Sequence, residues 1–338
     1  MRPSSRHALA RRLDQRFASA YALTKCDFIC IVSLFIASVI AFATLGYRRV
    51  IPMPPCTTPR AIIIGDVHGC ARELRAMLRR VKPRAYCDRV YFTGDLIGKG
   101  PASIEALREV RALEAGGVYT TSLMGNHEAG FLRWLDARRS SSSSSSSISS
   151  SSSSSSKYDK ERLEWATSLG SDELLWLRER PLYAELPAEY GLVSVVHAGM
   201  EPGVPAHLQR RDLMLTMRSL LKNGSGTDAP GKQPFYWKTG WAARWKGPTH
   251  LVFGHDARRR LQRHPYATGI DAGAAYGGKL TALVLKAASN ASVATPPGQL
   301  LHGGKLIGVS GHKGSCAVEP TTKLKKEASE KKGVLMTT

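Results

Sequence analysis

The stretch AIIIGDVHGC at residues 61–70 decides the fold of this 338-residue chain. Its leading apolar residues form a continuous run, typical of a strand that is buried on both faces, and Gly65 and Asp66 end that run. Apolar side chains then recur at helical spacing from Leu74 to Val81. A buried strand followed by an amphipathic helix predicts the first half of a strand–helix–strand unit.

The same arrangement recurs along the chain. Two further apolar runs, at residues 89–95 and 120–126, are each followed by a stretch with helical spacing. Alternating strands and helices predict an α/β fold in which these strands pair in parallel. Later strands are expected at residues 192–199, 250–256 and 279–285.

Composition divides the chain into five segments. A nearly pure serine run cannot bury enough apolar surface to fold, so it predicts a mobile loop inserted in the domain. The expected segments are a basic cytoplasmic tail (1–25), a transmembrane signal anchor (26–47), a linker (48–60), the α/β domain (61–288, with the poly-Ser insertion at 140–156) and a Gly/Lys-rich tail (289–338).

The apolar segment near the amino terminus predicts a membrane anchor. Residues 28–47 carry no charged side chain, and a helix of that length spans a hydrocarbon core of about 30 Å. A cleaved signal peptide is the alternative, but its apolar stretch would be shorter. More basic residues precede the segment than follow it, which predicts a single-pass protein with a cytoplasmic amino terminus and a lumenal catalytic domain. N-glycosylation sequons at Asn223 and Asn290 are compatible with that orientation.

Polar side chains able to bind metal follow the apolar runs, at the points where strands are expected to end. Such positions project from a rigid sheet into an open crevice. In an extended segment, Asp66 and His68 would point to the same side and could share one ion. The candidates are Asp66, His68, Asp95, Asn126, His127, His197 and His255.

The chemistry of these groups favours two divalent ions of the zinc, manganese, cobalt or iron type. Asp95 would bridge the ions; Asp66 and His68 would complete the first site, whereas Asn126, His197 and His255 would complete the second. Two such ions activate water near neutral pH and stabilise phosphoryl oxygens during in-line displacement. The sequence therefore predicts a dinuclear phosphoesterase that uses a metal-bridging hydroxide as its nucleophile.

The blocks GDVHG, GDLIGKG, GNHE, HAG and GHD resemble, in this order, the signature of the calcineurin-like metallophosphoesterases. The resemblance extends from Ala61 to Leu285. It implies a two-sheet β-sandwich flanked by helices, here preceded by the single transmembrane helix, with the ions between the sheets. It also implies that His127 stabilises or protonates the leaving oxygen.

Two positions separate this chain from the phosphoprotein Ser/Thr phosphatases of that family, whose second block reads GDxVDRG. Gly98 replaces the Asp that would orient the catalytic His, and Lys99 replaces an Arg. A lysine is a flexible point charge and cannot grip phosphate with two prongs as arginine does. The sequence instead resembles the symmetrical diadenosine tetraphosphate hydrolases and the ApaH-like phosphatases, which cleave phosphoanhydride bonds.

The expected substrate is inorganic polyphosphate, cleaved within the chain. The net charge of +21 suits a polyanion, and the anchored layout is similar to that of the fungal vacuolar zinc-dependent endopolyphosphatases, which implies a vacuolar location. Lys99 and Arg258 are the candidate phosphate contacts. Alternatives are a dinucleoside polyphosphate or RNA-cap pyrophosphatase, a Ser/Thr phosphoprotein phosphatase, and a membrane tether with a vestigial site. No sequence-specific nucleic-acid binding is expected.

The cysteines leave their pairing open. Four of the six, Cys56, Cys70, Cys87 and Cys316, lie outside the membrane segment. The sequence has no C-x-x-C pair, so a thiolate metal site is not expected.

Overall fold

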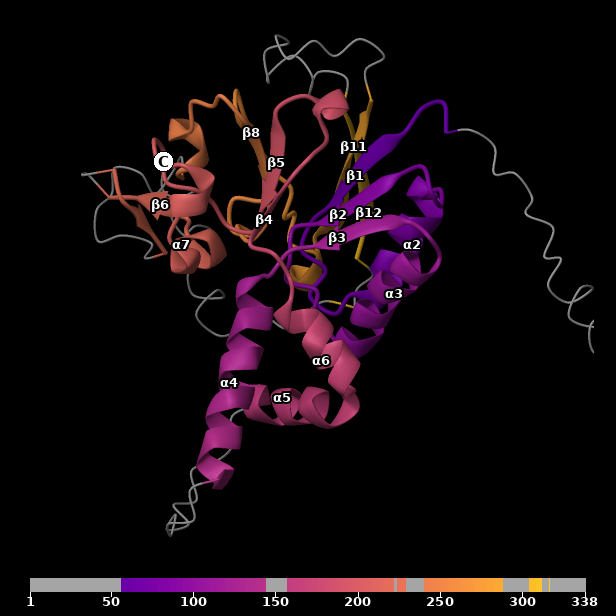
Figure 1. Ribbon diagram of the computed structural model, residues 1–338, viewed down its shortest axis with the longest axis vertical. Helices are drawn as coiled ribbons and strands as arrows, with labels where there is room; N and C mark the ends of the chain where they lie inside the picture. The colour runs from indigo at the N-terminus through magenta and orange to yellow at the C-terminus, as the bar shows by residue number, and fades with distance from the viewer. Residues whose placement is uncertain are drawn as a thin grey trace, which may run out of the picture. The chain divides into compact units, whose positions relative to one another are not determined.

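The computed structural model describes residues 56–143, 157–221, 224–228, 240–287, 304–311 and Cys316. Its centre consists of two five-stranded mixed sheets (Figure 1). The first has the strand order β12-β11-β1-β2-β3 and the second β4-β5-β8-β10-β9. This arrangement confirms the predicted α/β class with two sheets and helices.

The first sheet is built on β1 (Arg60–Ile64), which pairs in parallel with β2 (Arg89–Phe92). β3 (Tyr119–Ser122) continues the parallel series next to β2, as predicted. On the other side of β1, β11 (Lys279–Lys286) pairs in the antiparallel sense. The carboxyl ends of β1, β2 and β3 therefore meet at one edge of the sheet.

Residues of β1 alternate between two apolar cores, as the two-residue period of a strand requires. Ile62 and Ile64 pack among residues of the helices, whereas Ala61 and Ile63 pack against Val195 and other residues of the second sheet. The run is continuously apolar because both of its faces are covered.

The second sheet contains two parallel pairs and two antiparallel edges. β5 (Val193–Val196) pairs in parallel with β8 (His250–Phe253), and β8 with β10 (Ala267–Gly269). β4 (Tyr183–Glu185) and β9 (Gln262–His264) form the antiparallel edges. A separate hairpin joins β6 (Ser219–Leu220) to β7 (Gly226–Thr227).

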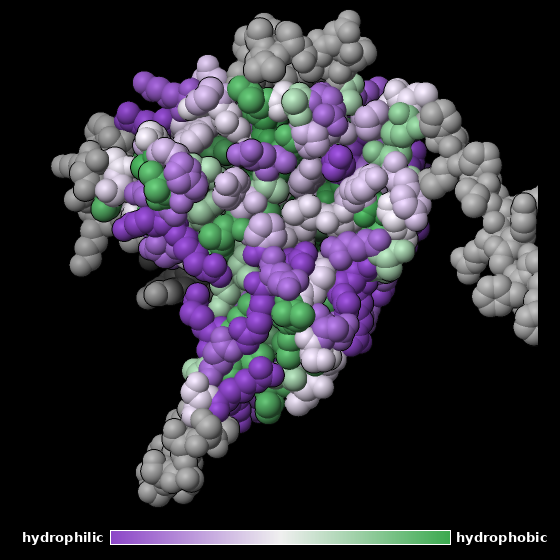
Figure 2. Space-filling view, in the orientation of Figure 1, coloured by the Kyte–Doolittle hydropathy of each residue, from purple (hydrophilic) through white to green (hydrophobic). Residues whose placement is uncertain are grey.

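Most of the helices lie on the side of the first sheet and extend below it, whereas α7 lies beside β6 (Figure 1). Leu74, Met77 and Val81 are buried on the predicted face of the first helix. Hydrophilic side chains cover the outer surface over α2 and α3 in Figure 2, as expected for amphipathic helices. The helices are α2 (Ala71–Val81), α3 (Ser103–Ala115), α4 (Asn126–Ser143), α5 (Lys157–Ser168), α6 (Ser171–Arg178) and α7 (Arg211–Thr216).

Two predicted boundaries need correction. The serine run begins inside α4, which continues to Ser143, so its first residues are helical. The expected tail contains β12 (Lys305–Ser310), which pairs with the outer edge of β11. This strand was missed because Gly308 interrupts a short apolar pattern, and the available edge of β11 is set by the fold.

Two disulfides resolve the pairing that the sequence left open. Cys56 pairs with Cys87, and Cys70 pairs with Cys316 across a sequence separation of 246 residues. The second bond joins Cys316 to the residue that precedes α2.

The predicted membrane anchor at residues 26–47 lies outside the described ranges, as do Asn223 and Asn290 of the sequons and the serine run after residue 143. No helix within those ranges is both long enough and apolar enough to cross a bilayer.

Candidate metal centre

The predicted ligands come together where five strands end. Asp66 follows β1, Asp95 follows β2, and Asn126 opens α4 after β3. His197 and His255 follow β5 and β8 of the second sheet. Residues from five distant parts of the chain thus meet at the carboxyl ends of strands from both sheets.

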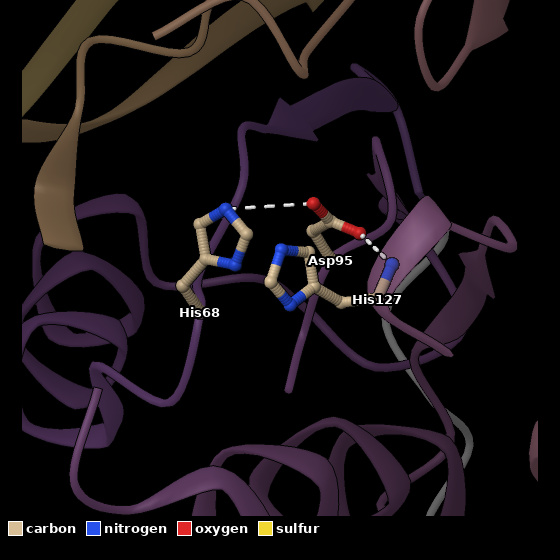
Figure 3. Close-up of side chains that lie close together, drawn as sticks. All are labelled: His68, Asp95 and His127. Atoms are coloured by element: carbon tan, nitrogen blue, oxygen red, sulfur yellow. Dashed lines mark hydrogen bonds and ion pairs between the residues drawn. The ribbon is translucent and has the colours of Figure 1, made fainter. Parts of the chain in front are cut away.

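Asp95 lies between two histidines. Its Oδ2 atom is 3.4 Å from Nε2 of His68 (Figure 3), and its Oδ1 atom is 3.6 Å from Nε2 of His197. Oδ2 is buried and accepts no hydrogen bond from any residue in the described ranges. A carboxylate with a histidine beside each oxygen has the position of a ligand that bridges two metal ions.

Asn126 lies between His197 and His255. Its Oδ1 atom lies 3.0 Å from Nε2 of His197 and 2.9 Å from Nδ1 of His255. Possible metal ligands, one oxygen and two nitrogens, therefore converge from α4 and from the segments after β5 and β8. Asp95, His197 and His255 form one group whose ligand atoms lie within 4.8 Å of one another.

Backbone carbonyls orient the rings of the three histidines. The other ring nitrogen of His197 lies 2.9 Å from the carbonyl oxygen of Thr93, and that of His255 lies 3.1 Å from the carbonyl oxygen of Thr216. Nδ1 of His68 similarly faces the carbonyl oxygen of Ile97 at 3.4 Å. Such carbonyls hold the proton on one nitrogen and leave the other free for a metal ion.

Burial lowers the pKa of His68, His197 and His255, so these imidazoles are neutral near pH 7. Neutral imidazoles keep the lone pair that a metal ion needs.

Asp66 is held by two hydrogen bonds. Its Oδ1 accepts from the Thr93 hydroxyl at 2.7 Å, and its Oδ2 accepts from the His255 backbone N–H at 2.8 Å. Oδ2 lies 3.9 Å from Nε2 of His68. The expected strand alternation is not what brings this pair together, because β1 ends at Ile64 and His68 has a left-handed φ of 49°. Backbone hydrogen bonds from the loop to the Asp95 carbonyl shape the turn instead.

The electrostatics of the centre call for positive charge. Burial raises the pKa of Asp66 well above its usual value, and the negative charges of Asp271 and Asp95 raise it further. Asp271 is itself buried, and burial raises its pKa as well. Three buried carboxylates that repel one another are costly unless cations neutralise them. Oδ2 of Asp95 accepts no hydrogen bond within the described ranges, and the nitrogen and oxygen ligand set fits two divalent ions of the zinc or manganese class.

His127 lies next to Asp95 and His68. Its backbone N–H donates to Oδ1 of Asp95 at 2.9 Å (Figure 3), and its ring meets that of His68 edge to face at a centroid distance of 4.8 Å. Burial and the charge of Lys99 lower its pKa to about 4, against the opposite influence of Asp95. His68, Asp95 and His127 also have ligand atoms within 4.8 Å of one another. The ring therefore lies close enough to His68 and Asp95 to share an ion with them.

The two predicted phosphate contacts differ in position. Nζ of Lys99 lies 2.7 Å from Nε2 of His68, inside the centre. Arg258 is exposed in the turn that follows His255, and its role stays a prediction.

Glu128 is a residue of the centre to which the sequence interpretation gave no role. Its buried carboxylate accepts hydrogen bonds from three backbone N–H groups, those of Asp95, Ile97 and Gly125, at 2.9 to 3.0 Å. Burial and Asp95 raise its pKa to about 8, although those three donors act in the opposite direction. It clamps the loop of Asp95 to the start of α4. Its place in the GNHE block was the available signal.

Comparison with known proteins agrees with this arrangement. The family model described as calcineurin-like phosphoesterase matches residues 59–277. A curated relative from Psychromonas ingrahamii, named symmetrical bis(5'-nucleosyl)-tetraphosphatase, is 36% identical over 144 residues, which are 41% of this chain and 44% of the relative. The chain thus spans less than half the length of that relative. A relative of the same name from Aromatoleum aromaticum is 28% identical over 275 residues and is covered to 92%.

A solved structure is also similar to this chain in both sequence and fold. It is provisionally described as a diadenosine tetraphosphatase and superimposes with a TM-score of 0.57 at 32% identity, covering 77% of this chain and 97% of that one. The match of the family model to most of the domain, together with this structure, confirms the family that the sequence blocks indicated. The chain belongs to the calcineurin-like phosphoesterase family.

Proposed function

We propose that the protein hydrolyses phosphoanhydride bonds and that its substrates are dinucleoside polyphosphates. The observation that carries the hydrolytic part is the position of Asp95, with His68 beside one oxygen and His197 beside the other. Asp95 would hold both ions when they are bound, and two ions together would supply the chemistry of in-line displacement at phosphorus.

The side chains divide the work. Asp66, His68 and Asp95 would hold one ion, whereas Asp95, Asn126, His197 and His255 would hold the other. When bound, the ions would supply a water of lowered pKa and stabilise charge on the phosphoryl oxygens. His127 lies beside Asp95 and would stabilise the leaving phosphate oxygen. In the reaction one P–O bond of the anhydride breaks, water supplies OH to one phosphorus, and its remaining proton goes to the leaving phosphate.

Lys99 would bind a phosphate that flanks the scissile bond. Its ammonium donates a hydrogen bond to Nε2 of His68. The lone pair of that nitrogen is the one that an ion would bind. Once that lone pair is occupied, the lysine is available to a substrate oxygen close by. Its single charge suits an anhydride oxygen and lacks the bidentate fit that an arginine gives.

The choice of substrate rests on the relatives. The two relatives described above carry the name symmetrical bis(5'-nucleosyl)-tetraphosphatase, which supports the second of the substrates considered from the sequence. Inorganic polyphosphate remains a second candidate because the net charge of +21 favours a long polyanion. A phosphoprotein substrate is disfavoured by Gly98 and Lys99.

A substrate panel tests this proposal. The full-length protein, supplied in turn with manganese, cobalt and zinc, is incubated with diadenosine tetraphosphate, a cap dinucleotide, long polyphosphate and a phosphopeptide. We expect diadenosine tetraphosphate to be split into two molecules of ADP. Faster cleavage of polyphosphate would select the second candidate, and turnover of the phosphopeptide alone would overturn both. Asp95→Asn is the inactive control.

We also propose that residues 26–47 anchor the protein and that its catalytic domain faces an oxidising compartment. The two disulfides support this location, since such bonds are rare where thiols are kept reduced. Protease protection of sealed membrane vesicles tests the orientation. Digestion of the intact catalytic domain from the cytoplasmic side would contradict it.

A further inference from the structure

Tyr276 is a half-exposed aromatic side chain close to the metal centre, and neither the family signature nor the proposed ligand set assigns it a role. It ends the short 3₁₀ turn Ala274–Tyr276, which precedes β11, and 39% of its surface is exposed. We propose that Tyr276 is a stacking platform for a nucleobase of the substrate. This inference rests on the proposed function and specifies which part of a dinucleoside polyphosphate the protein recognises.

Lys99 connects the tyrosine to the reacting groups. Its Nζ atom lies 5.2 Å from the centroid of the Tyr276 ring, in cation–π contact, and 2.7 Å from Nε2 of His68. The ammonium of Lys99 therefore lies between the Tyr276 ring and His68, which is proposed to bind an ion. A nucleoside diphosphate would place its phosphates at Lys99 and the centre and its base at the ring.

The backbone that carries the tyrosine is held in a defined place. Ala274 and Ala275 are buried in the core. The turn is closed by hydrogen bonds from the N–H of Tyr276 to the carbonyl of Gly273 and from the N–H of Gly277 to that of Ala274. Asp271, at the edge of the centre, accepts from the N–H of Gly273 at 2.9 Å. A platform fixed in this way loses little conformational entropy when a base stacks on it.

The chemistry of the pair suits a nucleotide better than a bare phosphate chain. A lysine alone would serve either ligand, but a part-exposed aromatic ring beside it adds nothing for inorganic polyphosphate. Stacking of a base on an aromatic ring strengthens binding and tolerates any base, because every base has a π-face. Tyr276 should therefore favour nucleotides over polyphosphate without selecting adenine over guanine.

Kinetics on two substrates test the platform. Tyr276→Leu removes the aromatic face, and Tyr276→Phe keeps it. With manganese, we expect the leucine variant to raise KM for diadenosine tetraphosphate about tenfold, with kcat little changed, and to leave KM for inorganic tripolyphosphate as in the wild type. The phenylalanine variant should match the wild type on both substrates.

A matched control is available at the other end of the first sheet. Tyr119 is also an exposed tyrosine with a cation over its ring, the guanidinium of Arg89 at 5.0 Å, but it lies at the start of β3. Tyr119→Leu should therefore leave both KM values unchanged. A leucine variant at 276 that behaves like this control, or that loses tripolyphosphate and dinucleotide equally, would overturn the platform.

Direct binding separates this inference from the proposed function. Isothermal calorimetry with ADP as the ligand, in the presence of manganese, measures binding to the protein without any turnover. If the wild type hydrolyses neither substrate but binds ADP about tenfold more tightly than Tyr276→Leu, the proposed reaction fails and the platform stands. If the wild type hydrolyses tripolyphosphate but binds ADP no better than the leucine variant does, the platform fails and the hydrolase stands. A wild type that neither hydrolyses nor binds overturns both.

Discussion

The backbone of Gly98 lies against the imidazole of His127: a Cβ atom at position 98 would come 2.3 Å from Nδ1 of that ring. Gly98 also has a left-handed φ of 93°. The glycine that replaces an aspartate of the phosphoprotein phosphatase motif is thus required by the packing of His127. Its replacement would displace the histidine proposed to stabilise the leaving group.

Gly98→Ala should therefore lower kcat at least about tenfold, because a Cβ at this distance must displace the His127 ring. Steady-state kinetics on diadenosine tetraphosphate measure the loss. Gly203→Ala is the matched control, since Gly203 also has a positive φ, of 81°, but nothing lies within 4 Å of its Cβ position. Comparable kcat losses in the two variants would mean that backbone strain, and not contact with His127, is responsible.

Asp95→Asn should remove the charge shared by the two proposed ion sites. We expect the bound metal to fall from two ions to one or fewer per chain and kcat to fall at least about a hundredfold. Metal content after gel filtration is measured by mass spectrometry, which gives a readout independent of turnover. Asp136→Asn, in an exposed pair with Arg178, is the control and should keep two ions. Two ions in the Asp95 variant would show that this carboxylate is no bridge.

Glu128→Gln should destabilise the centre without touching an ion ligand directly. The amide places an N–H donor against a backbone donor, so one of three buried hydrogen bonds is lost. A loss of about 2 kcal/mol in the free energy of unfolding is expected, and urea denaturation measures it. Glu105→Gln, which disrupts only an exposed pair with Arg75, should change stability by less than about 0.5 kcal/mol. Equal stability of the two variants would contradict the clamp.

Asp88 should make the domain sensitive to acid. Burial by itself would raise its pKa, but hydrogen bonds from Arg84 and Arg60 outweigh burial and hold the pKa well below the usual 3.8. A depressed carboxyl pKa contributes stability above the unfolded value, and that contribution is lost as the pH falls below about 4. Thermal unfolding from pH 6 to pH 3 should therefore show a steeper loss for the wild type than for Asp88→Asn. Parallel curves for the two proteins would exclude Asp88 and its two arginines as the cause of the acid sensitivity.

Much of the domain follows from local sequence. The buried strands and the inward face of α2 were predictable because apolar periodicity is a property of neighbouring residues, and β1 and α2 are where residues 61–81 predict them. The metal-binding side chains were predictable for a related reason. Polar residues that directly follow buried strands are carried to one edge of a parallel sheet, so Asp66, Asp95 and Asn126 converge with little need for other information.

Other features were decided by contacts between residues far apart in the chain. The edge of β11 turns residues 305–310 into a strand, and disulfide formation joins Cys70 to Cys316. No local pattern could reveal that Gly98 makes room for His127, or that Lys99 lies between His68 and Tyr276. The residue types along the chain determined which chemistry is present, whereas three-dimensional packing determined which groups touch, because contact depends on distances that sequence separation does not encode.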